Sequence, residues 1–258
     1  MRKSLFFFLI YLSFCISAPA RELDAWRVEK STHFLVHYRN APKDFIARIV
    51  RESEKHYNQI AQSLGYNRYD FWLWDKRARI YIYDNQKQYQ DSMHGPDWSA
   101  GLALPREKII HTYVEAPDFF AAILPHELGH IIFREFVGFN NSAIPLWLEE
   151  GLATYQENQL NIFHQAVFGK ALRENRLFSL EELSNFDPTS SPDQERVEIY
   201  YAQAANIVEY LLKKMSRDKF VTFCRDLRER QDFLRALSRV YSFKDLSELE
   251  TDWKGYLR

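Results

Sequence analysis

The sequence contains little cysteine: Cys15 and Cys224 are the two cysteines among its 258 residues. Cys15 lies in an N-terminal stretch that we expect to be removed, so no internal disulfide can form and stability must come from a hydrophobic core. An excess of charge is also absent, since 34 basic residues face 35 acidic ones. Loss of the leader, with Arg2 and Lys3, would change the net charge from −1 to about −3. This balance gives no indication of nucleic-acid binding.

Internal repeats and low-complexity linkers are also missing, which excludes solenoids and strings of tethered modules. The chain is rich in hydrophobic residues, which make up 46 % of the sequence, and 16 % of its residues are aromatic. Over the roughly 238 residues that follow the leader, one large domain or two tightly joined subdomains can bury enough surface to fold.

The first twenty residues predict a secretory signal. Two basic residues precede an apolar run over about 5–16, and small residues at 18–20 are typical of a cleavage site before Arg21. Cleavage there predicts a secreted or periplasmic protein without a stable membrane span. A retained membrane anchor is the alternative, but the run is shorter than the about 20 residues that cross a bilayer.

The N-terminal half of the remaining chain predicts a small mixed β-sheet with a helix packed on it. Helical spacing of apolar residues runs from Asp44 to Leu64. Alternating patterns predict four strands, at 32–38, 78–83, 99–104 and 108–114.

From Asp118 onward the spacing is helical almost to the end, with an interruption by a loop at 185–192. We therefore predict an α+β fold that forms a single domain over 21–258. A sheet subdomain (21–116) precedes a mainly α-helical subdomain (117–258).

The motif HELGH, His126 to His130, lies where the sheet gives way to the helices. Asp118 is a plausible N-cap, and Pro125 predicts a kink or a restart of the helix just before His126. Histidines four residues apart share one helix face, so both imidazoles can reach a single ion at about 2.0–2.1 Å. Glu127 cannot easily bind the same ion, but beside a metal-bound water it can accept the proton of that water.

Two histidines leave a tetrahedral zinc site one protein ligand short. A metzincin would have a glycine at 133 and a histidine at 136, but both positions hold phenylalanine, which excludes that class. The other option is a glutamate on a second helix, and the run from Pro145 to Tyr155 offers Glu149 and Glu150. These two lie almost equally far from the apolar stripe of that helix, on opposite sides, so periodicity does not choose between them.

The motifs HELGH and WLEEGLATYQE resemble those of the gluzincin metallopeptidases, in particular the aminopeptidase branch. The second helix of that branch carries a W-L-N-E-G-F-A-like run whose ligand glutamate stands directly before the glycine. The resemblance assigns Glu150 to the ligand position, twenty residues after His130, and places Glu149 where the family has asparagine. Nearly the whole chain after Arg21 is also similar to the families grouped as peptidase MA-like, which implies a zincin-like fold.

The same resemblance suggests further parts of a catalytic site. Tyr201 stands where aminopeptidases have a catalytic tyrosine that stabilises the oxyanion, and its neighbour Tyr200 is the rival for this role; either ring could instead pack in the core. Family members place an edge strand above the zinc that pairs with substrate backbone, and 100–104 is the candidate here. This stretch lacks the glutamate with which aminopeptidases bind a free amino terminus. Endopeptidase or dipeptide-trimming activity therefore stays open.

The sequence thus predicts a zinc-dependent peptidase that acts on peptide or protein substrates. His126, His130 and Glu150 are expected to bind Zn²⁺, with Glu127 as general base and Tyr201 as oxyanion donor. Cobalt or manganese would fit the same ligands. The alternative is a non-catalytic zincin-fold binding protein of the cell envelope with a structural or vestigial metal site.

Neither reading fixes the oligomeric state. The six other histidines lack ligand spacing to one another and are expected in the core or on the surface: His33, His37, His56, His94, His111 and His164.

Overall fold

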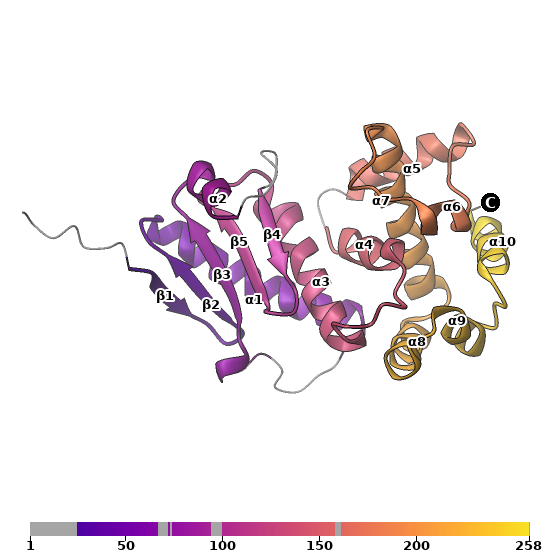
Figure 1. Ribbon diagram of the computed structural model, residues 1–258, viewed down its shortest axis with the longest axis horizontal. Helices are drawn as coiled ribbons and strands as arrows, with labels where there is room; N and C mark the ends of the chain where they lie inside the picture. Colours follow the sequence, from indigo (N-terminus) through magenta and orange to yellow (C-terminus); the bar gives the residue numbers. More distant parts are fainter. Residues whose placement is uncertain (1–24, 67–71, 73, 94–99, 158–160, 258) are drawn as a thin grey trace, which may run out of the picture.

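A computed structural model describes residues 25–66, 72, 74–93, 100–157 and 161–257 (Figure 1). The predicted signal at 1–20 lies outside these residues. The fold is α+β, as expected, with a five-stranded sheet followed by a helical region. The strands are β1 (Arg27–Lys30), β2 (Phe34–Tyr38), β3 (Ala78–Tyr83), β4 (Gly101–Leu104) and β5 (Ile109–Tyr113).

The sheet has the strand order β1-β2-β3-β5-β4. Its three central strands, β2, β3 and β5, are parallel, while β1 and β4 pair antiparallel at the two edges. Helix α1 (Lys43–Ser63) connects β2 to the parallel strand β3, as a crossover must. Between β3 and β5 the chain passes through α2 (Gln86–Met93) and the edge strand β4.

One face of the sheet forms the core of this half of the molecule. Val36, Ile80 and Ile110 occupy adjacent positions on the three central strands and are fully buried. Helix α1 packs on this face, behind the sheet in Figure 1, and α3 also contacts both α1 and β4. Buried residues recur every three or four positions along α1, as expected for an amphipathic helix with one face against the core. These residues are Ile46, Ile49, Ser53, His56 and Ile60.

The opposite face of the sheet carries a row of stacked rings. The ring of Tyr81 lies between those of His37 and His111, with centroid distances of 4.5 and 5.2 Å. These three residues are in register across β2, β3 and β5. Arg79 lies on the same face, two residues before Tyr81.

The helical region begins after β5, so the predicted boundary at 116–117 falls between β5 and the first helical turn. That turn, Phe119–Ile123, is a π-helix that leads directly into α3 (Leu124–Val137). The further helices are α4 (Leu146–Tyr155), α5 (Asn161–Arg173), α6 (Leu180–Asn185), α7 (Gln194–Glu209), α8 (Arg217–Arg230), α9 (Phe233–Tyr241) and α10 (Leu246–Tyr256), with a π-helical turn at Tyr210–Lys214.

The predicted cap at Asp118 is not formed in the expected way. Asp118 precedes the helical turn, but its backbone is left-handed, with φ of 53°, and its side chain accepts no capping hydrogen bond. The backbone amides of residues 121 to 123 instead bond to the Asp118 carbonyl, which produces the wide π turn. The α-helix then starts at Leu124 with Pro125 in its first turn, so the restart before His126 is present.

Helix α4 lies between α3 and α7, and two glycines allow the close contacts on either side of it. A Cβ atom on Gly129 of α3 would lie 3.0 Å from the Cα of Ala153 in α4. A Cβ atom on Gly151 of α4 would lie only 2.5 Å from the carbonyl oxygen of Ala204 in α7. At these points the backbone of α4 packs directly against α3 on one side and α7 on the other.

Cys224, on α8, is fully buried. The hydroxyl of Tyr66 donates a hydrogen bond to its sulfur at 3.3 Å. Burial raises the pKa of the Cys224 thiol to about 12. The ring of Tyr66 in turn stacks on Phe136 of α3, so the thiol lies in the core next to these two rings.

Candidate metal centre

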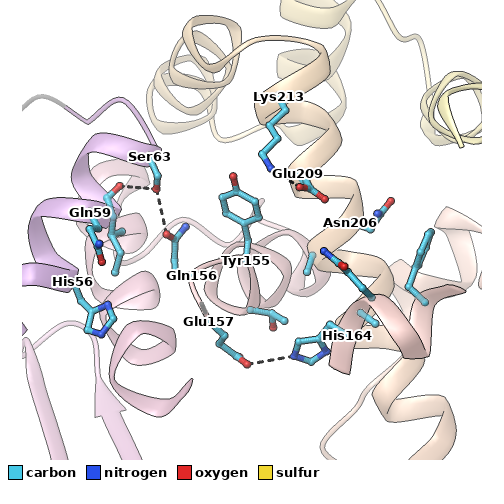
Figure 2. Close-up of a pocket in the computed structure, with 16 residues that line it drawn as sticks. His56, Gln59, Ser63, Tyr155, Gln156, Glu157, His164, Asn206, Glu209 and Lys213 are labelled. Carbon is cyan, nitrogen blue, oxygen red and sulfur yellow. Dashed lines mark hydrogen bonds and ion pairs between the residues drawn. The ribbon is translucent and has the colours of Figure 1, made fainter. Parts of the chain in front are cut away.

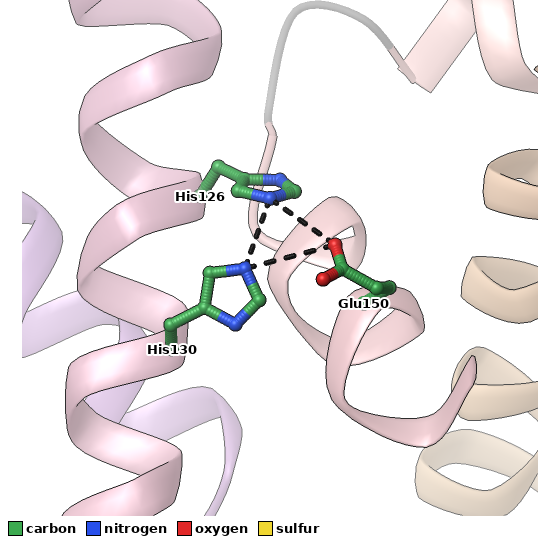
Figure 3. A group of neighbouring side chains, drawn as sticks. All are labelled: His126, His130 and Glu150. Carbon is green, nitrogen blue, oxygen red and sulfur yellow. Dashed lines mark hydrogen bonds and ion pairs between the residues drawn. The ribbon is translucent and has the colours of Figure 1, made fainter. Parts of the chain in front are cut away.

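Helices α3 and α4 bring three predicted metal ligands together (Figure 3). His126 and His130 lie one turn apart on α3, and their Nε2 atoms are 3.1 Å apart. Oε2 of Glu150, on α4, lies 3.6 Å from Nε2 of His126 and 3.7 Å from Nε2 of His130. Figure 3 shows the carboxylate of Glu150 directed between the two rings.

These spacings fit a single small divalent ion. Four ligands at about 2.0–2.1 Å in a tetrahedron are separated from one another by about 3.4 Å. The three observed separations of 3.1, 3.6 and 3.7 Å lie on both sides of that value. Two imidazole nitrogens and one carboxylate oxygen are also the donor set of a catalytic zinc site with one open position.

The far side of the His126 ring is held by a carboxylate. Oε1 of Glu157, just beyond the end of α4, lies 2.6 Å from Nδ1 of His126. Burial alone would lower the pKa of His126, but its contacts with Glu150 and Glu157 outweigh this effect and raise the pKa to about 10 in the metal-free protein. A hydrogen bond from Nδ1 to a carboxylate fixes the ring orientation and leaves Nε2 to bind an ion.

The other histidine has a similar support, which distinguishes Glu149 from Glu150. Oε1 of Glu149 lies 3.5 Å from Nδ1 of His130. Glu149 therefore contacts the ring nitrogen that is not directed toward Glu150. The carboxylate of Glu149 also accepts two hydrogen bonds from Arg134, one of them at 2.7 Å from Nε. Burial would raise the pKa of Glu149, but His130 and Arg134 lower it to about 2. Glu149 therefore faces the back of His130, while Glu150 faces the space between the two Nε2 atoms.

Glu127 follows His126 on α3, and Tyr201 lies on α7, which packs against α4. The negative charge of Glu127 acts on both His126 and Tyr201. Tyr201 is half-buried, and burial raises its pKa, with Glu150 and Glu157 raising it further. Its hydroxyl therefore stays protonated at neutral pH and can donate a hydrogen bond.

Tyr200 is in a different environment. It is fully buried, and its ring packs near Phe178 and Phe186. Its hydroxyl is inaccessible and has no hydrogen-bond partner among the described residues. Burial is the largest cause of its raised pKa. Tyr200 thus packs as a core residue, whereas Tyr201 is partly open to solvent.

The predicted edge strand lies next to the helix that carries HELGH. β4 is the last strand at its edge of the described sheet, and it contacts α3. A Cβ atom on Gly101 would lie 2.4 Å from the side chain of Ile123, at the end of the turn before α3. The strand at 101–104 therefore borders the helix that carries HELGH.

Two residues around the site were not predicted. Glu157 is the last residue of WLEEGLATYQE, but nothing in the spacing of that run indicated a contact with His126. His164 on α5 was expected to be an ordinary core or surface residue, yet its Nε2 lies 3.3 Å from Oε2 of Glu157. No sequence signal connects His164 to the metal motif.

Comparison with known families agrees with this geometry. The sequence profile of the Peptidase MA superfamily matches residues 74–258, which include both metal-ligand helices. The chain belongs to this superfamily. The match begins at Trp74, so it leaves out β1, β2 and α1, which the sequence resemblance had included. No curated protein sequence matches the chain.

Membership of the Peptidase MA superfamily confirms the predicted zincin-like fold and indicates a metallopeptidase-like function. The superfamily is generally metal-dependent, and His126, His130 and Glu150 form a cluster that could bind a metal. A peptidase of this kind acts on peptides or proteins. Within the described part of the chain, no helix has both the length and the hydropathy of a membrane span.

Proposed function

We propose that this protein is a zinc-dependent peptidase of the gluzincin type, exported to the periplasm or outside the cell. The observation that carries the proposal is the convergence of three ligand atoms from α3 and α4, within 4.8 Å of one another. A purely structural zinc site is closed by a fourth protein ligand. Here three ligands leave one position for water or substrate, and Glu127, the residue after His126 on the same helix, is the candidate base.

The side chains suggest how each would contribute to hydrolysis. A bound zinc ion supplies a Lewis acid and lowers the pKa of a water molecule to about 7. Glu127 accepts the proton of the attacking water and delivers it to the nitrogen of the leaving amine. Tyr201 donates its hydroxyl hydrogen to the oxyanion that develops at the substrate carbonyl. Glu157 and Glu149 hold the two imidazoles from behind, so the ligand atoms keep their positions while substrate and product exchange.

Digestion of a diverse peptide library, read by mass spectrometry, tests this function. Residues 21–258 should cleave peptides, and both Glu127→Gln and a chelator should abolish cleavage. Glu127→Gln should still bind one zinc ion, whereas Glu150→Gln should lose it, because only the second substitution removes a ligand. The cut positions would also show whether the enzyme trims ends or cuts internally.

The controls separate catalysis from binding. Cleavage that persists in Glu127→Gln would contradict the proposed base. A wild-type protein that binds zinc and cleaves no peptide would favour the alternative of a non-catalytic zincin-fold binding protein. A wild-type protein that binds no zinc would contradict the metal site itself.

A further inference from the structure

A cavity of about 410 Å³ has Glu157 in its wall (Figure 2). Residues of α1, the C-terminal end of α4, α5 and α7 also line it. Glu157 contacts Nδ1 of His126, while Nε2 of the same ring faces Glu150. The wall of the cavity therefore includes the carboxylate that contacts the ring nitrogen directed away from the position of the metal.

His164 enters this cavity from α5 and contacts the outer oxygen of Glu157. Its Nε2 lies 3.3 Å from Oε2, while Oε1 of the same carboxylate lies 2.6 Å from His126. Figure 2 shows the imidazole directed at the carboxylate. The side chains of Glu157 and His164 are only 9 % and 16 % exposed. Three side chains from separate segments thus form a continuous polar row that ends at a metal ligand.

The hydrogen atoms of this row can be assigned from the chemistry. If Nε2 of His126 binds a metal, Nδ1 carries the hydrogen and donates to Oε1 of Glu157. Oε2 then accepts from Nε2–H of His164, and Nδ1 of His164 is left as an acceptor. That nitrogen is buried and has no hydrogen-bond partner among the described residues.

An unpaired buried nitrogen does not favour folding, because it loses its contact with water and gains no other. The hydrogen bonds of the His164 ring are therefore incomplete, and they do not by themselves explain why a histidine is buried at this position. Among the described residues, the contact with Glu157 is the one hydrogen bond that accounts for the orientation of the ring. Leucine would fill a similar volume without leaving a polar atom unpaired, so the imidazole is better explained by an effect on Glu157.

We propose that His164 is a positioning residue for the metal centre. By donating to Glu157, it fixes the carboxylate that orients His126, and so raises the affinity for the metal. This inference rests on the metal site of the proposed function but not on catalysis. Groups that support metal-binding histidines typically change metal affinity by about 10–100-fold.

The test compares zinc dissociation constants, measured by competition with a chelator of known affinity, for the wild type and three variants. His164→Leu should weaken zinc binding by about tenfold, because it removes the donor to Glu157. His164→Gln should bind within about threefold of the wild type, since its amide nitrogen can donate from nearly the position of Nε2. Gln59→Leu makes a comparable polar-to-apolar change in the same cavity, from α1, and should have no effect.

Two further measurements distinguish positioning from folding. The visible spectrum of the cobalt-loaded protein should change in His164→Leu and return toward that of the wild type in His164→Gln, because the spectrum reports ligand geometry. The midpoint of thermal unfolding of the metal-free proteins should be no lower in His164→Leu than in the wild type. A lower midpoint that accounts for the lost affinity would make the role of His164 structural and overturn the proposal.

A double variant tests whether His164 acts through Glu157. Glu157→Gln alone should weaken zinc binding, and adding His164→Leu should weaken it little further, because the coupling partner is already changed. Equal affinities of the wild type and His164→Leu would show that His164 does not position the site. Equally weak binding by the leucine and glutamine variants would also overturn the proposal. A wild type without zinc affinity would instead contradict the proposed metal site.

Discussion

At the scale of single residues, the two histidines of the HELGH motif use both ring nitrogens. Each directs Nε2 toward Glu150 and Nδ1 toward another carboxylate, Glu157 or Glu149. Glu149 and Glu150, neighbours on α4, thus face Nδ1 and Nε2 of the His130 ring, respectively. Glu149 is paired with Arg134, which keeps its charge balanced close to the metal position.

The two tyrosines in the middle of α7 should respond differently to the loss of the hydroxyl group. We expect Tyr201→Phe to lower kcat for peptide cleavage by about 10²-fold with little change in KM, because a lost oxyanion donor affects mainly the transition state. Tyr200→Phe should leave kcat unchanged and leave the thermal midpoint equal or higher, since it removes a buried hydroxyl without a partner among the described residues. Steady-state kinetics and thermal unfolding check both. The opposite order of kcat losses would assign the role to Tyr200.

Spacing within one element predicts which side chains lie close together, and the metal role of these side chains stays a prediction. The pair His126 and His130 follows from the helical repeat, and the structure places both beside Glu150. The choice of Glu150 over Glu149 came from family resemblance and not from periodicity. Glu157 and His164 lie 31 and 38 residues after His126, and only tertiary packing brings them to it.

At the scale of elements, the metal ligands depend on how closely α4 approaches its neighbours. Gly151→Ala should destabilise the protein by about 1–3 kcal/mol, although alanine favours helices, because the new methyl group meets the backbone of α7. Displacement of α4 should also weaken zinc binding through Glu150. Thermal unfolding and chelator competition would measure both effects.

Gly255→Ala in α10 is the matched control, because nothing lies within 4 Å of the added Cβ atom. This change should stabilise the protein by up to about 1 kcal/mol and leave zinc affinity unaltered. If both substitutions stabilised the protein to the same degree, the contact between α4 and α7 would be looser than described.

The elements that the sequence predicted well are those with a clear buried face. β3 matches its predicted bounds, and α1 differs from its prediction by one residue at each end. β1 was not predicted, because its four residues are all exposed and show no alternation; it forms only by pairing with β2. The π turn before α3 was missed for a similar reason, since apolar spacing does not distinguish it from an α-helix.

At the scale of the whole molecule, three histidines make stability depend on pH. Burial lowers the pKa of His37, His56 and His111, and the charge of Arg79 lowers it further for the two on the sheet. In the unfolded chain these groups titrate near pH 6.5. Their contribution to stability is therefore fully present above about pH 6.5 and is lost as the pH falls toward their folded values. His126 acts in the opposite sense, because its pKa is raised to about 10: its contribution to stability grows as the pH falls toward 6.5 and is fully present below that value.

We expect the thermal midpoint, measured in the presence of a chelator, to fall between about pH 6.5 and about pH 5, where the contribution of His126 is constant and that of the three histidines is lost. Replacement of His37 and His111 by glutamine should make that fall smaller. A double variant whose midpoint fell as steeply as that of the wild type would show that other groups cause the pH dependence.

The sequence also predicted the overall division into a sheet and a helical region, because the period of the apolar pattern changes near residue 118. It did not predict the order of the strands, which depends on pairings between segments far apart in the chain. The placement of α4 between α3 and α7 was equally hidden, since it depends on contacts at two glycines that no periodicity marks.

The buried thiol of Cys224 gives the folded protein a chemical reporter. In a chain that begins at Arg21 it is the one cysteine, and its sulfur lies against Tyr66 in the core. A thiol-alkylating reagent reaches it only in molecules where α8 has separated from its neighbours. The rate of alkylation therefore measures how often the core around Cys224 opens. A comparison of this rate with and without zinc would show whether an ion bound by α3 and α4 also restrains α8, which supplies none of the predicted ligands.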